Sequence, residues 1–291
     1  MVELALGRAA AADFVELSKP RIVTMVAITA GAGYLLAGPA SQWMTLVHTL
    51  AGTALVAGGA CALNQVAERD VDARMRRTAS RPIPAGRLGV VEGAVFGALA
   101  GASGIAWLAA SVNAVTAALA AATLVLYVFL YTPLKRRTSL AILVGAVPGA
   151  LPIVGGWTAA GGALDTSAAA LFWILFLWQL PHFLALGWIY RVDYARAGLR
   201  IGSEADDDGR RTFRQAALQA AALLAVSLAP TPLGLAGPAY FFGALLLSAG
   251  FLLAATEAAR APSAPSARRL FLVSLVYLPA LLTLMLLDRR P

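Results

Sequence analysis

Charged residues are scarce in this chain: Asp, Glu, Lys and Arg make up 13% of its 291 residues, against about 25% in a soluble domain. This low share argues against an ordinary water-soluble fold. The single cysteine, Cys61, excludes an intrachain disulfide and any cysteine-rich metal or iron–sulfur site. The N-terminus also lacks the pattern of a signal peptide, because Glu3, Asp13 and Glu16 precede the first apolar run.

Apolar residues, by contrast, make up 59% of the chain. Many lie in runs of about the length that an α-helix needs to cross a bilayer. We therefore expect an all-α, polytopic membrane helix bundle with nine transmembrane helices. One integral-membrane domain would cover residues 1–291, with residues 1–20 as a cytoplasmic N-terminal segment. The expected spans are 22–38, 43–63, 89–109, 111–131, 140–160, 168–190, 215–235, 237–256 and 270–287.

The basic residues lie on alternate connections between these spans, apart from Arg289 and Arg290 at the C-terminus. Positive residues mark the cytoplasmic face of a membrane protein. The N-terminus and the two large charged loops, 64–88 and 191–214, are therefore expected in the cytoplasm. This regular placement also explains the net charge of +8 by membrane topology, so we expect no nucleic-acid partner.

The most highly charged stretch is residues 64–87, NQVAERDVDARMRRTASRPIPAGR. Read as a helix, it places Asn64, Glu68 and Asp72 on one face, because each step of four residues turns only about 40°. Asp70 lies on another face, where Arg74 at i+4 is its expected partner. Mg²⁺ prefers oxygen ligands and often joins carboxylates to substrate phosphates, which arginines also bind. The stretch thus predicts a site for a metal-bridged, multiply charged anion.

The second charged loop, 191–214, carries Asp193 and an acidic run at 204–208 among further arginines. Two acidic clusters on facing helices would hold Mg²⁺ and, through it, a diphosphate. In an otherwise apolar bundle, the rest of such a substrate is expected to be a hydrocarbon. The alternative for the acidic run is a solvated loop with no ligand.

The stretch 64–87 resembles the first aspartate-rich motif of the UbiA superfamily of intramembrane prenyltransferases, in which Gln65 and Glu68 here replace aspartates. Its form N-x-x-x-E-R-D-x-D-x-x-M-x-R-T is more similar to the protohaem IX farnesyltransferase (haem O synthase) branch than to the quinone branches. Further similar stretches follow in order: ELSKPRI at 16–22, YTPLKRRTS at 131–139, FLWQLPHFLAL at 176–186 and DYARAGL at 193–199. The sequence departs from that branch at Arg200–Ser203, where P-M-L-P is usual.

The resemblance implies a UbiA-type bundle that transfers the farnesyl group of farnesyl diphosphate to a vinyl group of haem b. It implies Mg²⁺ held by Asn64, Glu68, Asp72 and Asp193, which with Lys135 form the expected catalytic set. The implied substrate-binding residues are Arg77, Arg81, Arg137, Tyr131, His182 and Trp178. The implied setting is the bacterial inner membrane, with haem A synthase or oxidase assembly factors as protein partners.

Two other functions stay open at this point. A UbiA-type enzyme of the quinone branches would prenylate an aromatic ring instead of haem. A haem carrier or transporter would perform no chemistry, but transporters place ionisable residues near the bilayer midplane. Here most charges gather at one expected face, which favours an enzyme whose site lies at the membrane surface.

Overall fold

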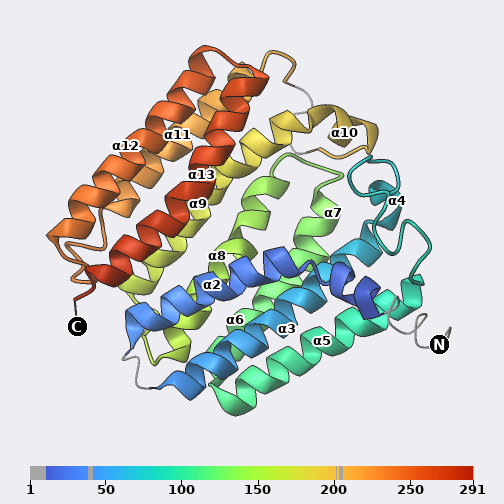
Figure 1. The fold of residues 1–291 in the computed structure, drawn as a ribbon, viewed down its shortest axis with the longest axis horizontal. Helices are drawn as coiled ribbons and strands as arrows, with labels where there is room; N and C mark the ends of the chain where they lie inside the picture. Colours follow the sequence, from blue (N-terminus) through green and yellow to red (C-terminus); the bar gives the residue numbers. More distant parts are fainter. Residues whose placement is uncertain (1–10, 39–41, 201, 203–205, 291) are drawn as a thin grey trace.

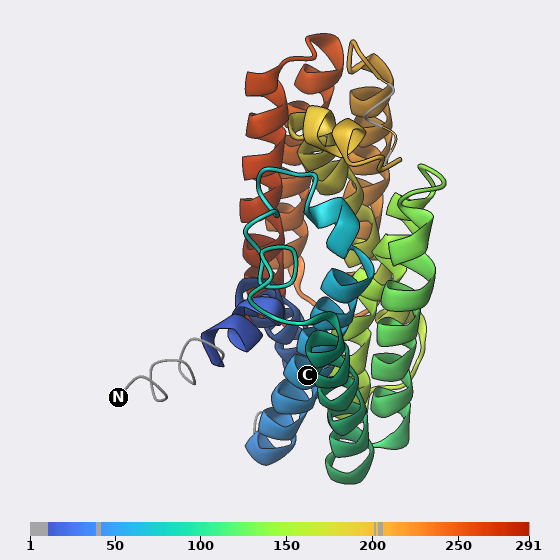
Figure 2. The same cartoon turned by 90° about the vertical axis from the view of Figure 1, so that its right-hand side faces the viewer.

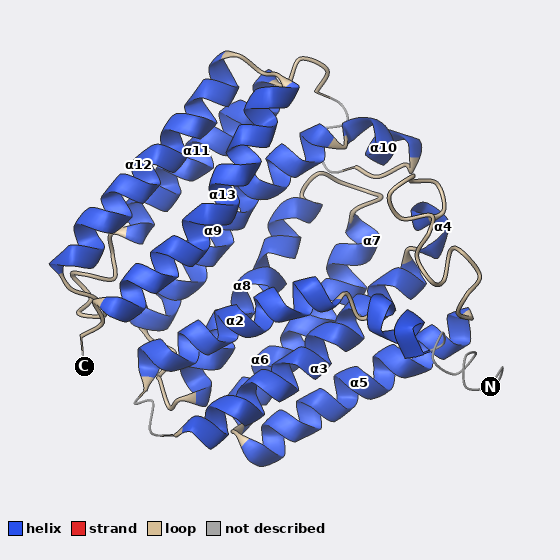
Figure 3. Cartoon of the chain, viewed as in Figure 1, coloured by secondary structure: helices blue, strands red, loops and turns tan. Residues whose placement is uncertain are grey.

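Helices make up most of the chain, as the long apolar runs predicted (Figure 3). The structure, a computed structural model, describes residues 11–38, 42–200, 202 and 206–290. Within these ranges it contains no β-strand, and the only extended pairing is an isolated antiparallel bridge between Ala236 and Arg289. The fold is therefore all-α, as expected.

The long helices agree with the expected spans to within a few residues at most ends. They are α2 (Pro20–Ala37), α3 (Trp43–Ala67), α5 (Val90–Ser111), α6 (Ala114–Val125), α8 (Ala141–Ala159), α9 (Thr166–Ile189), α11 (Arg210–Ser227), α12 (Pro238–Arg260) and α13 (Ala264–Leu287). The shorter elements are three helices and one π-helical turn: α4 (Arg69–Asp72), η1 (Leu126–Tyr131), α7 (Thr132–Leu134) and α10 (Arg191–Arg196). Residues 11–17 are also helical.

Eight segments among the described residues are long and apolar enough to cross a membrane, and α6, η1 and α7 together form one of them. The protein is thus a polytopic membrane protein. The expected span 215–235 is wrong in its boundaries. Its helix, α11, begins in charged sequence at Arg210 and ends at Ser227, because Pro230 has no N–H to continue it. The count of nine stays a prediction, since α11 is not among the eight.

The helices form two groups that meet at α9 (Figure 1). In one group α9 packs with α11, α12 and α13, and in the other α8 packs with α2 and α6, while α3 packs with α5. Apolar side chains between α8, α9, α11, α12 and α13 form the largest buried cluster. Both charged connections, with α4 and α10, lie at the same end of the bundle and face the viewer in Figure 2.

Close helix contacts depend on glycine at two interfaces. A Cβ atom at Gly59 of α3 would lie 2.6 Å from the Gly97 carbonyl oxygen of α5. A Cβ atom at Gly156 of α8 would overlap the Ala30 carbonyl oxygen of α2. Small residues allow membrane helices to approach at this distance. The first contact fixes α3, which carries the polar site, against α5, and the second fixes α2 against α8.

Candidate functional site

The polar site begins where helix α3 ends. We expected one continuous helix through Asn64, Glu68 and Asp72, and this was wrong: the helix breaks at Glu68, whose φ of −102° and ψ of 9° separate α3 from α4. The three side chains are nevertheless buried together, with exposures of 1%, 6% and 1%. Buried polar groups of this kind require partners.

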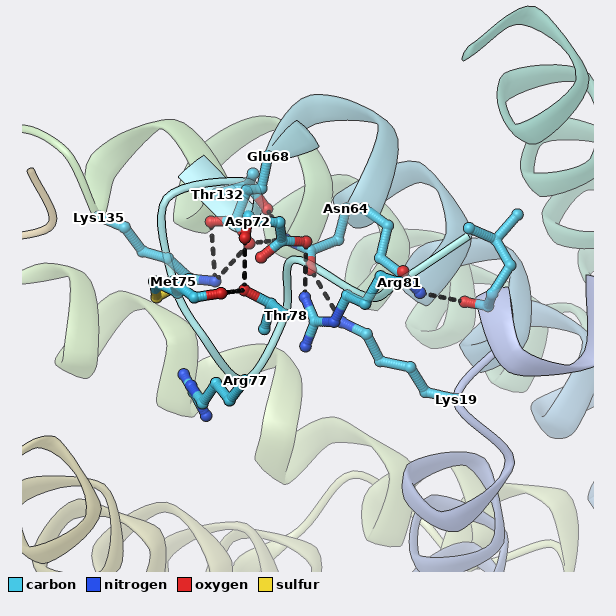
Figure 4. A network of polar contacts seen from close by, with 12 residues as sticks. Lys19, Asn64, Glu68, Asp72, Met75, Arg77, Thr78, Arg81, Thr132 and Lys135 are labelled. Carbon is cyan, nitrogen blue, oxygen red and sulfur yellow. Dashed lines mark hydrogen bonds and ion pairs between the residues drawn. The ribbon is translucent and has the colours of Figure 1, made fainter. Parts of the chain in front are cut away.

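Each of the three buried residues has a positively charged partner from a different segment (Figure 4). The Lys19 ammonium donates to Asn64 Oδ1 at 3.2 Å. The Lys135 ammonium lies 3.0 Å from Glu68 Oε1. The Arg81 guanidinium donates to Asp72 Oδ2 at 2.6 Å.

The orientation of the Asn64 amide follows from its neighbours. Its Nδ2 donates to Glu68 Oε2 at 2.9 Å and to Thr132 Oγ1 at 3.0 Å. The Thr132 hydroxyl has one proton, which it donates to the Tyr127 carbonyl at 2.8 Å, so it must accept from Asn64. Three contacts therefore fix the orientation of the Asn64 amide. The Glu68 carboxylate and the Thr132 hydroxyl both accept from Nδ2, and the Lys19 ammonium donates to Oδ1. The carbonyl oxygen Oδ1 is turned toward the cationic side.

The π-helical turn η1 positions Thr132 for this contact. The Thr132 N–H bonds the Tyr127 carbonyl five residues earlier, which is the π-helical pattern and occurs often at functional sites. The same turn places the Tyr131 ring beneath Lys135, with the ammonium 4.4 Å from the ring centroid. A Cβ at Gly145 would lie 2.5 Å from that ring, so glycine leaves room for Tyr131.

The site carries an excess of positive charge. Burial, together with the nearby Arg81 and Lys135, lowers the pKa of Lys19 to about 8. Burial also acts against the charged form of Lys135, but Tyr131 and the Glu68 carboxylate outweigh it and raise the pKa of Lys135. Three cationic side chains thus surround two carboxylates. Such a site favours an added anion over an added cation alone.

Lys19 reaches the site at a conformational cost. Its φ of 53° makes it the only non-glycine residue with a positive φ among the described residues. The left-handed region costs an L-residue roughly 1–2 kcal/mol. The turn ends the helical segment 11–17 and begins α2 at Pro20, and it leaves the Lys19 ammonium against Asn64.

The loop after α4 is held against α10, which covers the site from the charged end. The Arg77 guanidinium donates to the Tyr194 hydroxyl at 2.7 Å and lies 4.9 Å from the ring centroids of Tyr190 and Tyr194. An apolar cluster lies beneath this contact, formed by Val71, Met75, Tyr194, Ala197 and Leu199. The two charged connections are therefore packed together.

Asp193 lies on α10, partly buried, with its nearest cation Arg196 at 3.9 Å. Among the described residues no three His, Cys, Asp or Glu side chains lie close enough together to hold one ion. The structure thus brings Asn64, Glu68 and Asp72 together, while Asp193 is on the neighbouring element that packs against their loop.

The donor set fits a divalent metal with oxygen preference. Asn64 Oδ1, the Glu68 carboxylate and the Asp72 carboxylate are hard oxygen ligands of the kind that Mg²⁺ prefers. Glu68 Oε1 is buried and accepts no hydrogen bond from the described residues, its only partner being the Lys135 charge. A bound cation would therefore satisfy an oxygen that the protein leaves without a donor.

The remaining expected residues lie elsewhere. Trp178 and His182 form a separate cluster between α9 and α13, where their rings stack at 5.3 Å. Arg137 lines a hollow beside α11. Asp70 is exposed and lies 3.6 Å from Arg69, so the expected pairing with Arg74 was wrong.

The acidic run at 204–208 is described only in part, and Glu204 lies outside the described residues. Asp206 accepts a hydrogen bond from the Thr212 N–H at 2.6 Å. Burial opposes ionisation of Asp206, but its hydrogen bonds with Thr212 outweigh burial and lower its pKa. Asp208 lies 3.4 Å from Arg210. These two carboxylates stabilise the start of α11.

Three residues of the site were not predicted from the sequence to be functional: Lys19, Thr132 and Tyr194. Lys19 and Thr132 lie within quoted motifs, ELSKPRI and YTPLKRRTS. A lysine immediately before an apolar span and a threonine immediately after one are the signals that point to them. Their partner, Asn64, lies 45 and 68 residues away in the chain, which no local pattern reveals.

Known proteins resemble this chain over almost its whole length. A protein of Solibacter usitatus (strain Ellin6076), protoheme IX farnesyltransferase, is 45% identical over 287 residues, which cover 95% of this chain and 98% of the relative. A solved structure of digeranylgeranylglyceryl phosphate synthase shares the fold with a TM-score of 0.81 at 15% identity, over 96% of this chain and 98% of the other.

A UbiA homolog from Archaeoglobus fulgidus, solved with DMAPP and Mg²⁺, superposes with a TM-score of 0.68 at 14% identity, over 94% of this chain and 99% of the other. At identities of 14–15%, these structures are evidence for the fold alone. The model of the UbiA prenyltransferase family matches residues 26–278, from α2 to α13, which include every residue of the polar site except Lys19. The chain therefore belongs to the UbiA prenyltransferase family.

Proposed function

We propose that this protein transfers the farnesyl group of farnesyl diphosphate to a vinyl group of haem b, giving haem O and diphosphate. The observation that carries the proposal is the buried group of Asn64, Glu68 and Asp72, each paired with a cation at the charged end of an apolar bundle. The acceptor is inferred from the full-length relative named protoheme IX farnesyltransferase.

The side chains of the site would bind the diphosphate and stabilise the charge that develops on it. Lys19, Arg81 and Lys135 each hold an oxygen of the buried group, and each would turn to a phosphate oxygen when the substrate arrives. Arg77, on the neighbouring loop, would complete the set. Positive groups arranged in advance around a leaving anion lower the barrier to its departure.

Asn64, Glu68 and Asp72, with Asp193 from α10, would hold Mg²⁺. When bound, Mg²⁺ supplies charge that neutralises the diphosphate and makes it a better leaving group. The chain's own contribution is to hold the oxygens of Asn64, Glu68 and Asp72 buried together, with the Asn64 amide oriented by its hydrogen bonds.

In the proposed reaction, the bond between the allylic carbon and the diphosphate oxygen breaks, and the diphosphate leaves with the electron pair. The vinyl group attacks the cation-like allylic carbon, and a new carbon–carbon bond forms. Water then adds to the resulting cation and loses a proton, which gives a hydroxyethylfarnesyl group. The Tyr131 ring beside Lys135 would shelter positive charge through its π face.

His182 would contact the haem. The Ser274 hydroxyl donates its proton to the Phe271 carbonyl at 2.5 Å, so at its 2.8 Å contact with His182 Nδ1 it must accept. This leaves the lone pair on Nε2, the arrangement found in metal-binding histidines. Trp178 donates to the Ser274 carbonyl at 2.8 Å and stacks on His182, which provides a flat aromatic surface beside that nitrogen.

The setting would be the bacterial inner membrane, with α4, α10 and the N-terminus in the cytoplasm. The test is the purified protein in detergent with haem b and farnesyl diphosphate, followed by mass spectrometry of the extracted haem. Farnesylated haem is expected. Prenylated hydroxybenzoate or naphthoate in a parallel reaction, with haem b unchanged, would instead assign the protein to the quinone branches. Co-purification with haem A synthase would test the proposed protein partner.

A further inference from the structure

A second charged site lies on another side of the bundle. A hollow of about 550 Å³ opens between the turn after α7, the start of α8 and the first turns of α11. Three arginines line it: Arg137, Arg200 and Arg211. Lys135, two residues before Arg137, instead pairs with Glu68. Of the two cations in this turn, Lys135 thus lies in the polar site and Arg137 lines the hollow.

The sequence of α11 is unusual for a helix in this bundle, and the hollow explains why. One face of α11 carries four residues at spacings of four, three and one. They are Arg211, Gln215, Leu218 and Gln219. All four line the hollow. Gln219 Oε1 is buried and has no hydrogen-bond partner among the described residues. A buried polar group without a partner is costly, so Gln219 favours a ligand that bonds to it.

The three arginines of the hollow have no paired carboxylate. Within the part of the chain that the structure describes, the side chains of Arg137, Arg200 and Arg211 form no ion pair or hydrogen bond. Of the nearby carboxylates, Asp206 accepts from the backbone of α11 at Thr212, and Asp208 lies 3.4 Å from Arg210. Three arginines around one hollow therefore favour an anion.

Apolar side chains line the hollow together with the polar ones. Leu140 and Leu218 line it and are 60% and 66% exposed. The lining on α11 begins with Arg211 and continues with Gln215, Leu218 and Gln219. A cation followed by amide and apolar groups along one helix matches an anionic lipid, which combines a phosphate, ester groups and acyl chains.

We propose that this hollow is a binding site for an anionic phospholipid of the bilayer. The arginines would bind the phosphate oxygens, for which the guanidinium fork is suited. Gln215 and Gln219 would donate to the ester carbonyls, and the acyl chains would lie along Leu140 and Leu218. The bound lipid would fix the start of α11 against the turn after α7, next to Lys135. This site does not depend on the reaction proposed above.

The test uses the full-length protein in nanodiscs of dioleoylphosphatidylglycerol or dioleoylphosphatidylcholine, released and measured by native mass spectrometry. The protein should retain phosphatidylglycerol and release phosphatidylcholine. Arg211→Gln should weaken retention of phosphatidylglycerol about tenfold, because a charged hydrogen bond is lost. Arg214→Gln is the matched control, since it removes an equal charge from α11 at a side chain that does not line the hollow, and it should leave retention unchanged.

A second variant, Gln219→Leu, keeps every charge and should also weaken retention. Circular dichroism and thermal unfolding of each variant separate lost binding from lost folding. Equal retention of the two lipids, or equal loss from Arg211→Gln and Arg214→Gln, would overturn the proposal. Displacement of the lipid by one equivalent of haem b would also overturn it, by assigning the arginines to porphyrin carboxylates.

Discussion

The orientation of the Asn64 amide gives the sharpest prediction about the polar site. Thr132→Val keeps the volume of a buried side chain but removes the hydroxyl that accepts from Asn64 Nδ2 at 3.0 Å. The Tyr127 carbonyl keeps its bond from the Thr132 N–H, so the backbone turn is retained. What is lost is a partner of a buried amide on α3.

The magnitude follows from what the substitution leaves unpaired. A buried donor without an acceptor costs about 1–3 kcal/mol. Asn64 cannot recover by turning its amide, because Oδ1 would then face the Glu68 carboxylate, which now accepts from Nδ2 at 2.9 Å. Loss of such a supporting contact typically weakens metal binding about 10–100-fold. We expect a loss in that range, with a smaller fall in thermal stability.

The assay is Mn²⁺ binding measured by electron paramagnetic resonance, with the unreactive analogue farnesyl thiolodiphosphate present. Thr132→Ser retains the hydroxyl and should bind Mn²⁺ as the wild-type protein does. Thr116→Val is a second control, because Thr116 is also buried but bonds to Thr158 at 3.0 Å, away from Asn64. If Thr132→Val bound Mn²⁺ as tightly as Thr132→Ser, the orienting role of Thr132 would be refuted.

Three further predictions concern the Asp72 carboxylate, the contact of Arg77 with Tyr194 on α10, and the packing of α3 against α5. Asp72→Asn should lower turnover of farnesyl diphosphate by about 100-fold or more while circular dichroism shows a folded protein; full turnover would remove Asp72 from the site. Tyr194→Phe removes the acceptor of the 2.7 Å bond from Arg77 and should raise KM for farnesyl diphosphate about fivefold with kcat little changed; an unchanged KM would mean that the contact does not order Arg77. Gly59→Ala should destabilise the protein by about 1–3 kcal/mol, because the new Cβ would lie 2.6 Å from the Gly97 carbonyl. Gly250→Ala, where nothing lies within 4 Å, is its control, and equal melting temperatures would contradict this account.

Much of the site's composition was predictable, because ligands and phosphate-binding side chains lie in motifs with fixed local spacing. Asn64, Glu68 and Asp72 come together as their helical spacing predicted, although the helix breaks at Glu68. The partners were harder to assign. Arg77 was expected at the diphosphate and here contacts Tyr194, 117 residues away. His182 was expected to bind substrate, but only its contact with Ser274 of α13 shows which nitrogen is left free.

The all-α membrane fold and its charged end could be predicted from the sequence, because runs of apolar side chains and the placement of arginines act locally along each helix. The cation that pairs with each oxygen of Asn64, Glu68 and Asp72 could not be predicted, because it depends on how the helices pack. Lys19 reaches Asn64 because a left-handed turn and the packing of α2 against α3 bring them together. Thr132 turns the Asn64 amide because a π-helical turn places its hydroxyl there. Both contacts join segments far apart in the chain, and no local pattern encodes the relative position of two packed helices.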